Sequence, residues 1–277
     1  MVKKGPLKPT QQGLKLATKS TEAKAPTLTP MWGKPRPDTA KELLREVLPR
    51  PAAPQGNTGL SSERTRQRMV ERLMQQGIRN EKVLAAIQRV PRHRFVDEAL
   101  ASRAYEDSAL PIGHSQTISQ PFVVARVIEL ALQHLIKPTE APPAPVRALE
   151  VGTGCGYQAA VMAACFDQVV SIERIRALSD LARSNLRPLR VSNLRLVFGD
   201  GLTAGLPFAP FDVILLSAGM ANAPDELLSQ LSVGGVLVAP IGEPDQRLMV
   251  IQRVAESEFS RHAFDTVRYV PILRGTD

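Results

Sequence analysis

Ala148-Leu-Glu-Val-Gly-Thr-Gly-Cys-Gly-Tyr157 is the stretch of sequence that decides the fold. A short apolar segment, typical of a buried strand, runs directly into three alternating glycines, and a helical pattern follows them. Glycine lets the backbone turn sharply and approach a ligand closely. Because open α/β sheets bind ligands at the carboxyl ends of their strands, this turn predicts a nucleotide site beside the first strand of such a sheet.

The spacing of the glycines indicates which nucleotide is bound. Dinucleotide-binding proteins carry G-x-G-x-x-G, which aims a helix N-terminus at a pyrophosphate. Gly152, Gly154 and Gly156 form G-x-G-x-G instead. Glu150 stands two residues before the first glycine, where its charge would repel a pyrophosphate. An acid there suits the cationic ammonium and sulfonium groups of S-adenosylmethionine, so the pattern favours this cofactor.

Two further acids follow the next two predicted strands. Glu173 ends the second strand, about 20 residues on, where a carboxylate can bind both ribose hydroxyls. Asp200 follows the third strand, where it can accept a hydrogen bond from the adenine amino group. The alternative is that the glycines only allow tight packing and the acids cap helices. The residues predicted to bind the cofactor, without a metal, are Glu150, Gly152, Thr153, Gly154, Gly156, Glu173, Asp200 and Gly201.

Short apolar runs alternate with helical patterns from residue 146 onward. This alternation predicts right-handed βαβ units and an α/β fold, a Rossmann-like three-layer αβα sandwich with a mostly parallel central sheet. The strands are expected at residues 146–151, 168–173, 194–198, 211–217, 236–240, 247–254 and 264–271. Helices are expected at residues 62–76, at 121–135, between Asn80 and Pro91, and at 157–165, 175–189 and 223–231.

The net charge of +8 is concentrated at the N-terminus. Residues 1–60 hold 11 of the 35 lysines and arginines, four of the 27 acids and nine of the 23 prolines. We therefore expect a basic, proline-rich, disordered extension, either a solvated tail or an arm for a partner, with a short helical turn near 39–48. A methyltransferase domain is expected over 61–277, with a helical part at 61–145 and the cofactor-binding sheet at 146–277. Its near-neutral balance gives no phosphate-binding face.

Composition also bounds the location and the chemistry. The sequence has no apolar run long enough to span a membrane and no signal-peptide pattern, and it contains two cysteines. These features predict a cytoplasmic protein that needs neither a disulfide nor a metal. The four histidines show no spacing that supports a catalytic base.

A polar segment, Leu110-Pro-Ile-Gly-His-Ser-Gln-Thr-Ile-Ser-Gln-Pro-Phe122, precedes the third predicted helix. It is expected to be a loop that enters the active site, with the hydroxyls of Thr117 and Ser119 available as hydrogen-bond donors. The alternative is that Ser119, two residues ahead of Pro121, only caps the helix.

From about residue 61 onward the chain resembles the protein-L-isoaspartate O-methyltransferases. The matching segments are Val90-Pro-Arg-His-Arg-Phe95, Ala104-Tyr-Glu-Asp107, Leu110-Pro-Ile-Gly113, Gln116-Thr-Ile-Ser-Gln-Pro121, Glu150-Val-Gly-Thr-Gly-Cys-Gly-Tyr-Gln158, Ser171-Ile-Glu-Arg174, Gly199-Asp-Gly201, Gln230-Leu231, Gly234-Gly-Val-Leu-Val-Ala-Pro240 and Val267-Arg-Tyr-Val-Pro271. The Thr-Ile-Ser-Gln-Pro segment is the most specific, because general methyltransferases lack it.

The resemblance implies an activity and the residues that perform it. The family methylates the α-carboxylate of L-isoaspartyl residues in damaged proteins, with S-adenosylhomocysteine as the second product, and the ester then collapses to a succinimide. Ser119 would be the active-site hydroxyl. The residues implied to line the peptide pocket are Thr117, Ile118 and the segment 267–270, including Val267 and Tyr269. The implied partners are isoaspartyl-containing proteins and peptides, and we expect a monomer that does not bind membranes and whose core does not bind nucleic acid.

Two positions depart from the family pattern. Ser115 stands where a glycine is usual, and Leu216-Ser-Ala-Gly-Met220 replaces a typical Thr-Ala-Ala after the fourth strand. The second departure puts local pocket contacts in doubt, and leaves the reaction class unchanged.

Two other functions are considered. DNA amino-methyltransferases place a Pro-Pro-aromatic segment after the fourth strand, where a flipped base stacks, and pyrimidine C5 enzymes need a Pro-Cys nucleophile. The sequence has neither. A non-catalytic cofactor-binding or scaffolding protein would carry a damaged acceptor segment, whereas Thr117-Ile-Ser119 is intact.

Overall fold

The computed structural model describes residues 58–136 and 144–277. The predicted extension therefore lies almost entirely outside the described residues, as do the possible turn near 39–48 and most of the proline-rich segment around 138–145. The domain boundary at residue 61 stays a prediction.

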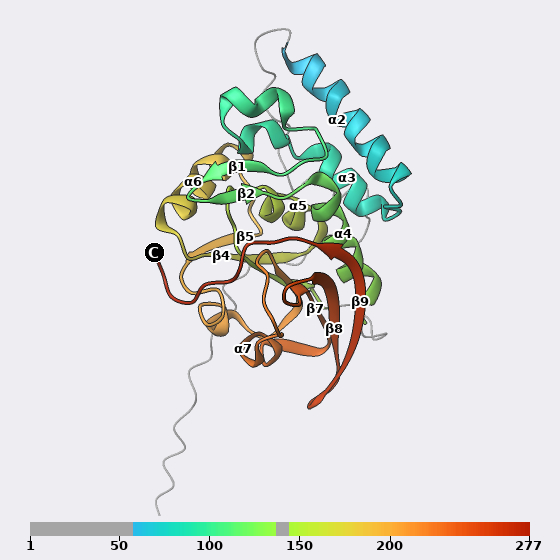
Figure 1. Ribbon diagram of the computed structural model, residues 1–277, viewed down its shortest axis with the longest axis vertical. Coiled ribbons are helices and arrows are strands. Elements are labelled where there is room, and N and C mark those ends of the chain that lie inside the picture. The colour runs from blue at the N-terminus through green and yellow to red at the C-terminus, as the bar shows by residue number, and fades with distance from the viewer. Residues whose placement is uncertain (1–57, 137–143) are drawn as a thin grey trace, which may run out of the picture. The chain divides into compact units, whose positions relative to one another are not determined.

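A sheet of seven strands, in the order β5-β4-β3-β6-β7-β8-β9, forms the centre of the described residues (Figure 1). The pairings from β5 through β7 are parallel, and β8 and β9 add antiparallel pairings. The expected α/β fold with a mostly parallel sheet is confirmed. The strands are β3 (Arg147–Val151), β4 (Gln168–Glu173), β5 (Leu194–Phe198), β6 (Phe211–Leu216), β7 (Leu231–Ile241), β8 (Gln246–Ala255) and β9 (Glu258–Val267).

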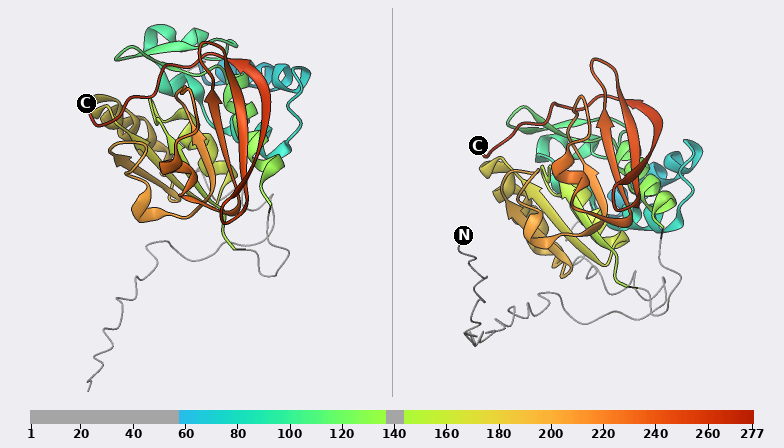
Figure 2. Two further views of the ribbon diagram at one scale, coloured as in Figure 1. Left: turned by 60° about the horizontal axis from the view of Figure 1, so that its bottom comes forward. Right: turned by 90° about the horizontal axis from the view of Figure 1, so that it is seen from below.

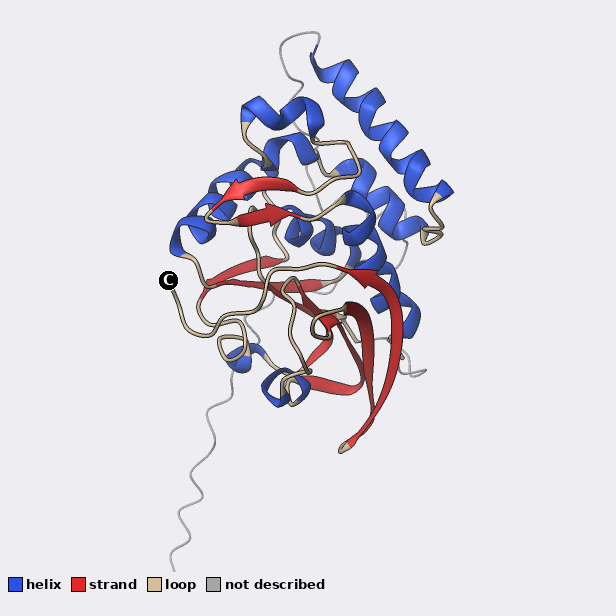
Figure 3. Ribbon diagram, in the orientation of Figure 1, coloured by secondary structure: helices blue, strands red, loops and turns tan. Residues whose placement is uncertain are grey.

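Helices cover the two faces of the sheet unequally (Figures 2 and 3). One face and its helices share a large apolar core, to which Ala148 and Val169 contribute from the strands. Short elements lie on the other face, where a β-carbon at Gly205 would come within 3.2 Å of the Leu149 side chain. The long helices are α2 (Thr58–Gln75), α3 (Glu81–Arg89), α4 (Pro121–His134), α5 (Tyr157–Cys165) and α6 (Arg176–Leu186), and the short ones are α7 (Asp225–Leu228) and the 3₁₀ turns η1 (Arg92–Phe95), η2 (Glu98–Arg103), η3 (Arg187–Leu189) and η4 (Leu206–Phe208).

The helix ends follow local sequence signals. The Asn80 side chain accepts hydrogen bonds from the amides of Lys82 and Val83, so it caps α3 as expected. Pro121 occupies the first turn of α4, where a missing amide hydrogen is tolerated. The buried Glu129 of α4 accepts the amides of residues 79 and 80 at 2.6 and 2.8 Å, which fixes the start of α3 against α4.

Three predicted elements at the C-terminal side were wrong in extent. The strand expected at 236–240 is β7, which runs from Leu231 to Ile241. The helix expected at 223–231 is only the single turn α7, because Leu231 already belongs to β7. The strand expected at 264–271 is β9, which begins at Glu258 and ends at Val267. Residues 270–273 leave the sheet and run across the carboxyl ends of the strands, where the Gly219 amide donates to Val270 at 2.7 Å (Figure 1).

The acceptor segment is a hairpin, and the expectation of a loop was wrong. Strands β1 (Leu110–Gly113) and β2 (Gln116–Ile118) pair antiparallel. His114 and Ser115 join them with φ values of 52° and 56°. Two consecutive left-handed residues are the mark of a type I′ turn, the connection that matches the twist of a hairpin. The segment holds a proline and mixed polar residues, so it shows no alternation that would reveal strands.

Ser115 occupies a conformation in which an L-residue is strained. We expect Ser115→Gly to raise the free energy of unfolding by roughly 0.5–1 kcal/mol. Glycine removes the strain of the left-handed backbone in the folded state. Its greater conformational freedom in the unfolded chain offsets part of this gain. Ser229→Gly is the matched control, because Ser229 has a φ of −67° and should lose stability. Urea denaturation measures both variants. A Ser115→Gly protein no more stable than the wild type would contradict the left-handed turn.

Candidate active site

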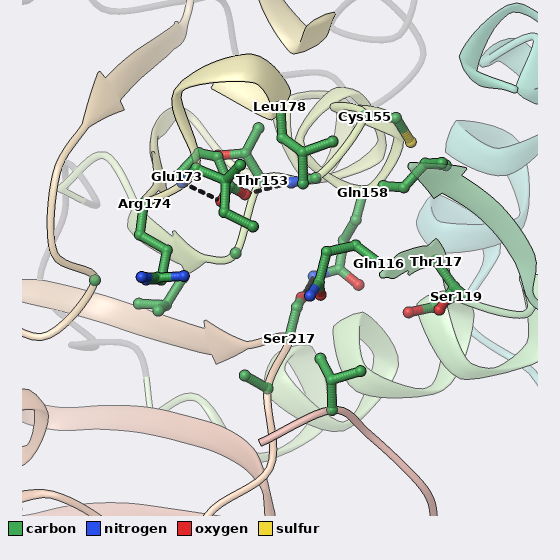
Figure 4. Close-up of a pocket in the computed structure, with 18 of the residues that line it drawn as sticks. Gln116, Thr117, Ser119, Thr153, Cys155, Gln158, Glu173, Arg174, Leu178 and Ser217 are labelled. Atoms are coloured by element: carbon green, nitrogen blue, oxygen red, sulfur yellow. Dashed lines mark hydrogen bonds between the residues drawn. The ribbon is translucent and has the colours of Figure 1, made fainter. Parts of the chain in front are cut away.

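A pocket of about 920 Å³, its open mouth included, lies at the carboxyl ends of β3, β4 and β6. Figure 4 shows Glu173 and Ser119 on opposite sides of it, with Gln116, Gln158 and Ser217 between them. The segments that line the pocket include the hairpin and Ser119 (112, 116–119), the glycine turn (151–155), the end of β4 (172–175) and the C-terminal segment (270–273).

The glycine turn joins β3 to α5 through three left-handed residues. Gly152, Gly154 and Gly156 have φ values of 95°, 55° and 91°. Gly152 and Gly154 line the pocket, together with Thr153. Gly156 does not; it starts α5, where a β-carbon would come within 2.8 Å of Leu186. Gly156 therefore lets α5 pack closely on α6, and its contact with the cofactor stays a prediction.

Glu173 is the acidic side chain that the structure places in the pocket wall. It is 5% exposed, and its two oxygens accept the amides of Gly154 at 2.8 Å and Ile175 at 2.9 Å. Each carboxylate oxygen accepts more than one hydrogen bond, so both keep capacity toward the pocket.

Glu150 lies beneath the glycine turn and does not line the pocket, which departs from its expected place beside the ligand. It is fully buried and accepts a hydrogen bond from Ser171, whose hydroxyl also lies 2.5 Å from that of Thr153. Burial raises the pKa of Glu150 to about 8, and the hydrogen bonds from Ser171 and Gln158 oppose the rise. Glu150 is therefore connected to the pocket by hydrogen bonds, through Ser171 to Thr153 and directly to Gln158.

Asp200 is likewise turned to the backbone. One carboxylate oxygen accepts the Leu202 amide at 2.9 Å, and the other accepts the Gly275 amide at 2.6 Å. Asp200 does not line the pocket, whereas its neighbour Gly201 does. A β-carbon on Gly201 would lie 2.3 Å from Val151, so only glycine lets this turn approach β3. In this structure Asp200 caps its own turn and holds the C-terminal segment, and its contact with the adenine stays a prediction.

The acceptor side is built around Ser119. Thr117, Ile118 and Ser119 all line the pocket. Burial raises the pKa of the Tyr269 phenol, which keeps it protonated, and a hydrogen bond from Ser119 opposes the rise. Neither Val267, the end of β9, nor Tyr269 lines the pocket; Val270 and the three residues after it do.

Sequence reasoning missed several pocket residues. Gln158 and Ser217 lie between the two halves of the pocket, and the Gln158 amide donates to the Ser217 hydroxyl at 3.0 Å. Arg174 lines the wall beside Glu173, and its guanidinium donates to the Gly275 carbonyl at 3.0 Å. Gln158 and Arg174 end two of the segments that resemble the family, which was the available signal. Val270 was implied by the same resemblance, whereas Ile272 and Leu273 had no signal, because their position depends on distant contacts.

Other groups do not contribute to this pocket. Within the described ranges, no histidine lines it, and no cluster of three or more metal-ligating side chains is present. Cys155 lines the pocket wall, but burial raises the pKa of its thiol to about 11, so it stays protonated at neutral pH. No helix in the described part of the chain is long and apolar enough to cross a bilayer.

The strand order, the glycine turn and the acid at the end of β4 define the class of Rossmann-like methyltransferases. The family model for protein-L-isoaspartate(D-aspartate) O-methyltransferase matches residues 64–277, and the chain belongs to this family.

Relatives and solved structures agree with this assignment. The protein-L-isoaspartate O-methyltransferase of Bordetella avium (strain 197N) is 53% identical over 249 residues, which cover 89% of this chain and 90% of the relative. That of Ralstonia nicotianae is 51% identical and covers 79% of this chain and 71% of the relative. A solved protein-L-isoaspartate O-methyltransferase has a TM-score of 0.65 at 27% identity, covering 74% of this chain and 65% of that chain. The enzyme from Plasmodium falciparum, solved with S-adenosyl-L-homocysteine, shares the fold with a TM-score of 0.65 at 22% identity, over 75% of this chain and 98% of that chain.

The raised pKa of Glu150 makes the stability of the protein depend on pH. Its value of about 8 exceeds the ordinary 4.5. The folded state therefore holds a proton that the unfolded chain loses between these values, and its stability falls as pH rises. Glu150→Gln has no carboxyl to ionise, so its stability should not fall with pH for this reason. The difference in unfolding free energy between Glu150→Gln and the wild type should therefore increase by about 1 kcal/mol per pH unit between pH 5 and 8.

Urea denaturation across this pH range measures the difference. Glu106→Gln is the control, because Glu106 is 53% exposed and its substitution should give no such trend. A wild-type and a Glu150→Gln protein with parallel pH profiles would show that Glu150 ionises normally in the folded state.

Proposed function

We propose that this protein transfers a methyl group from S-adenosylmethionine to the α-carboxylate of L-isoaspartyl residues in damaged proteins and peptides, which starts their repair through a succinimide. Membership of the family supports this activity. The observation that carries it in this chain is the placement of the Ser119 hydroxyl and the Glu173 carboxylate in the walls of one pocket. The first belongs to the acceptor segment and the second to the nucleotide-binding sheet.

The residues present fit an adenosylated sulfonium. Glu173 offers a buried carboxylate to the ribose hydroxyls, and the turn at Gly152 and Gly154 lets a ligand approach the backbone closely. Thr153 and Gly201 complete this side of the pocket. When bound, S-adenosylmethionine supplies an activated methyl group and a neutral thioether leaving group.

The acceptor needs little activation by the protein. A free α-carboxyl group has a pKa of about 3.5, so it is already an anionic nucleophile at neutral pH and needs no general base. Ser119 donates a hydrogen bond to this carboxylate and orients one oxygen toward the methyl group. Because Tyr269 stays protonated, it places no negative charge beside the acceptor carboxylate.

Alignment and exclusion of water are the remaining tasks. Holding the reacting atoms in line removes much of the entropic barrier of a bimolecular transfer. The hairpin covers the pocket on one side, and residues 270–273 cover it on another. Thr117 and Ile118 contact the peptide next to the reacting residue.

A DNA methyltransferase is the second candidate, and no specific observation favours it. The residues after β6 that line the pocket are Ser217 and Ala218, which provide no aromatic ring for a flipped base. We further propose a monomeric, cytoplasmic enzyme that acts without a metal; the two cysteines, Cys155 and Cys165, are free and buried, as a reducing compartment allows.

The role of Ser119 is tested by Ser119→Ala. We expect kcat for an isoaspartyl peptide to fall by about 10- to 100-fold, the loss typical of one transition-state hydrogen bond. The affinity for S-adenosylhomocysteine should stay unchanged, since Ser119 belongs to the acceptor side. Ser108→Ala is the control, because Ser108 precedes the hairpin and does not line the pocket. The N-cap of α4 is Gln120 and no side chain caps this helix, so a parallel loss of cofactor affinity and turnover would give Ser119 a packing role instead.

The substrate is tested with labelled methyl donor and three acceptors. These are an isoaspartyl peptide, its aspartyl twin and duplex DNA. We expect base-labile label in the isoaspartyl peptide alone, because a carboxyl methyl ester hydrolyses in alkali. Equal labelling of the two peptides, or labelling of DNA, would overturn the proposed function.

A further inference from the structure

Arg92, at the start of η1, is a charged residue with no exposed surface. Its Nε donates to the Ala104 carbonyl at 2.8 Å, and its Nη2 donates to the Ser119 carbonyl at 2.7 Å. The guanidinium also lies over the Tyr157 ring, 4.8 Å from the ring centroid. One side chain therefore contacts the loop after η2, the acceptor segment and the first residue of α5.

Burying this cation is costly, and the described residues offer no carboxylate at ion-pair distance to offset the cost. A hydrophobic residue of similar volume would fill the space without that penalty. What an apolar residue cannot provide is two directed hydrogen bonds and a planar group for stacking. The features that only arginine supplies are therefore the bonds to Ala104 and Ser119 and the contact with Tyr157.

These contacts join the two halves of the pocket. Tyr157 directly follows the glycine turn and lines the pocket wall. Ser119 lines the same pocket from the acceptor side. Since Arg92 binds one and stacks on the other, it fixes the backbone of the acceptor serine relative to the turn that receives the cofactor.

Arg92 fixes the backbone of the acceptor serine, since its Nη2 donates to the Ser119 carbonyl. A shift of the backbone at Ser119 would displace the hydroxyl from the acceptor. The bond from Arg92 opposes this shift.

We propose that Arg92 is a positioning residue for methyl transfer, which acts through Ser119 by fixing the direction of its hydroxyl. The proposal rests on the proposed function of this site. Arg92 does not line the pocket and touches neither reactant. Its contribution should appear in kcat rather than in the binding of either substrate.

The test is a double-mutant cycle between Arg92→Lys and Ser119→Ala. Lysine keeps the charge but cannot donate to both carbonyls and stack at once. We expect Arg92→Lys to lower kcat for an isoaspartyl peptide by about 10- to 100-fold, as a displacement of about 1 Å does. In the Ser119→Ala background the same substitution should lower kcat by less than about twofold, since residues that act as a unit are not additive.

Arg72→Lys is the matched control. Arg72 donates to the Tyr105 carbonyl at 2.6 Å, one residue from the Ala104 carbonyl that Arg92 binds, and it makes no bond to Ser119. It should leave kcat unchanged. For both lysine variants the affinity for S-adenosylhomocysteine is measured by calorimetry, and it should equal that of the wild type.

The outcomes separate this proposal from the proposed function. If the wild type methylates no isoaspartyl peptide, the function fails; if Ser119→Ala turns over normally, the role of Ser119 fails and the proposal with it. If Ser119→Ala is slow but the effects of Arg92→Lys and Ser119→Ala simply add, only the proposal about Arg92 is overturned. A parallel loss of cofactor affinity also overturns it. If Arg92→Lys does not fold, Arg92→Gln, which keeps a planar donor, is measured in its place. If neither variant folds, Arg92 has a structural role and the proposal is overturned.

Discussion

Two backbone amides bind one buried carboxylate at the centre of the site, and the rest of the pocket depends on this contact. Glu173 accepts Gly154 with one oxygen and Ile175 with the other, at 2.8 and 2.9 Å. The first amide lies in the turn after β3, and the second precedes α6. A single side chain therefore ties together the chain segments that leave two neighbouring parallel strands, and it does so in the wall that a ribose would contact. Because the group is an acid with two acceptor atoms, no neutral side chain of similar size satisfies both amides.

The acceptor half of the molecule is attached to this nucleotide-binding half through a few directed contacts. The hairpin and Ser119 come from residues before the sheet, and Tyr269 comes from after its last strand. Arg92 connects Ser119 to Tyr157, the residue that directly follows the glycine turn. The chemistry explains why such an arrangement suffices. An anionic carboxylate and an activated methyl donor need alignment and a dry site, so rigid positioning replaces acid–base groups.

Sequence patterns predicted the features that depend on local chemistry. Three alternating glycines marked the turn, because only glycine tolerates its left-handed backbone, and Glu173 followed from its place at the end of a strand. Features that depend on distant contacts were not predictable. Asp200 faces the backbone because Gly275 arrives from the far end of the chain. The hairpin at 110–118 pairs polar segments that lack alternation, and its Ser115 has a left-handed backbone that glycine would adopt without strain.

The central claim is that Glu173 both holds the glycine turn and binds the cofactor, and calorimetric titration with S-adenosylhomocysteine tests it most directly. The wild type should bind one equivalent. In Glu173→Gln, the side-chain NH2 group faces one of the two backbone amides, and two donors cannot bond each other. The affinity for S-adenosylhomocysteine should therefore fall by about 10- to 100-fold, the loss expected from an unsatisfied buried group. Glu106→Gln, at an exposed ion pair, should bind as the wild type does. A Glu173→Gln protein that binds S-adenosylhomocysteine with wild-type affinity would contradict the account.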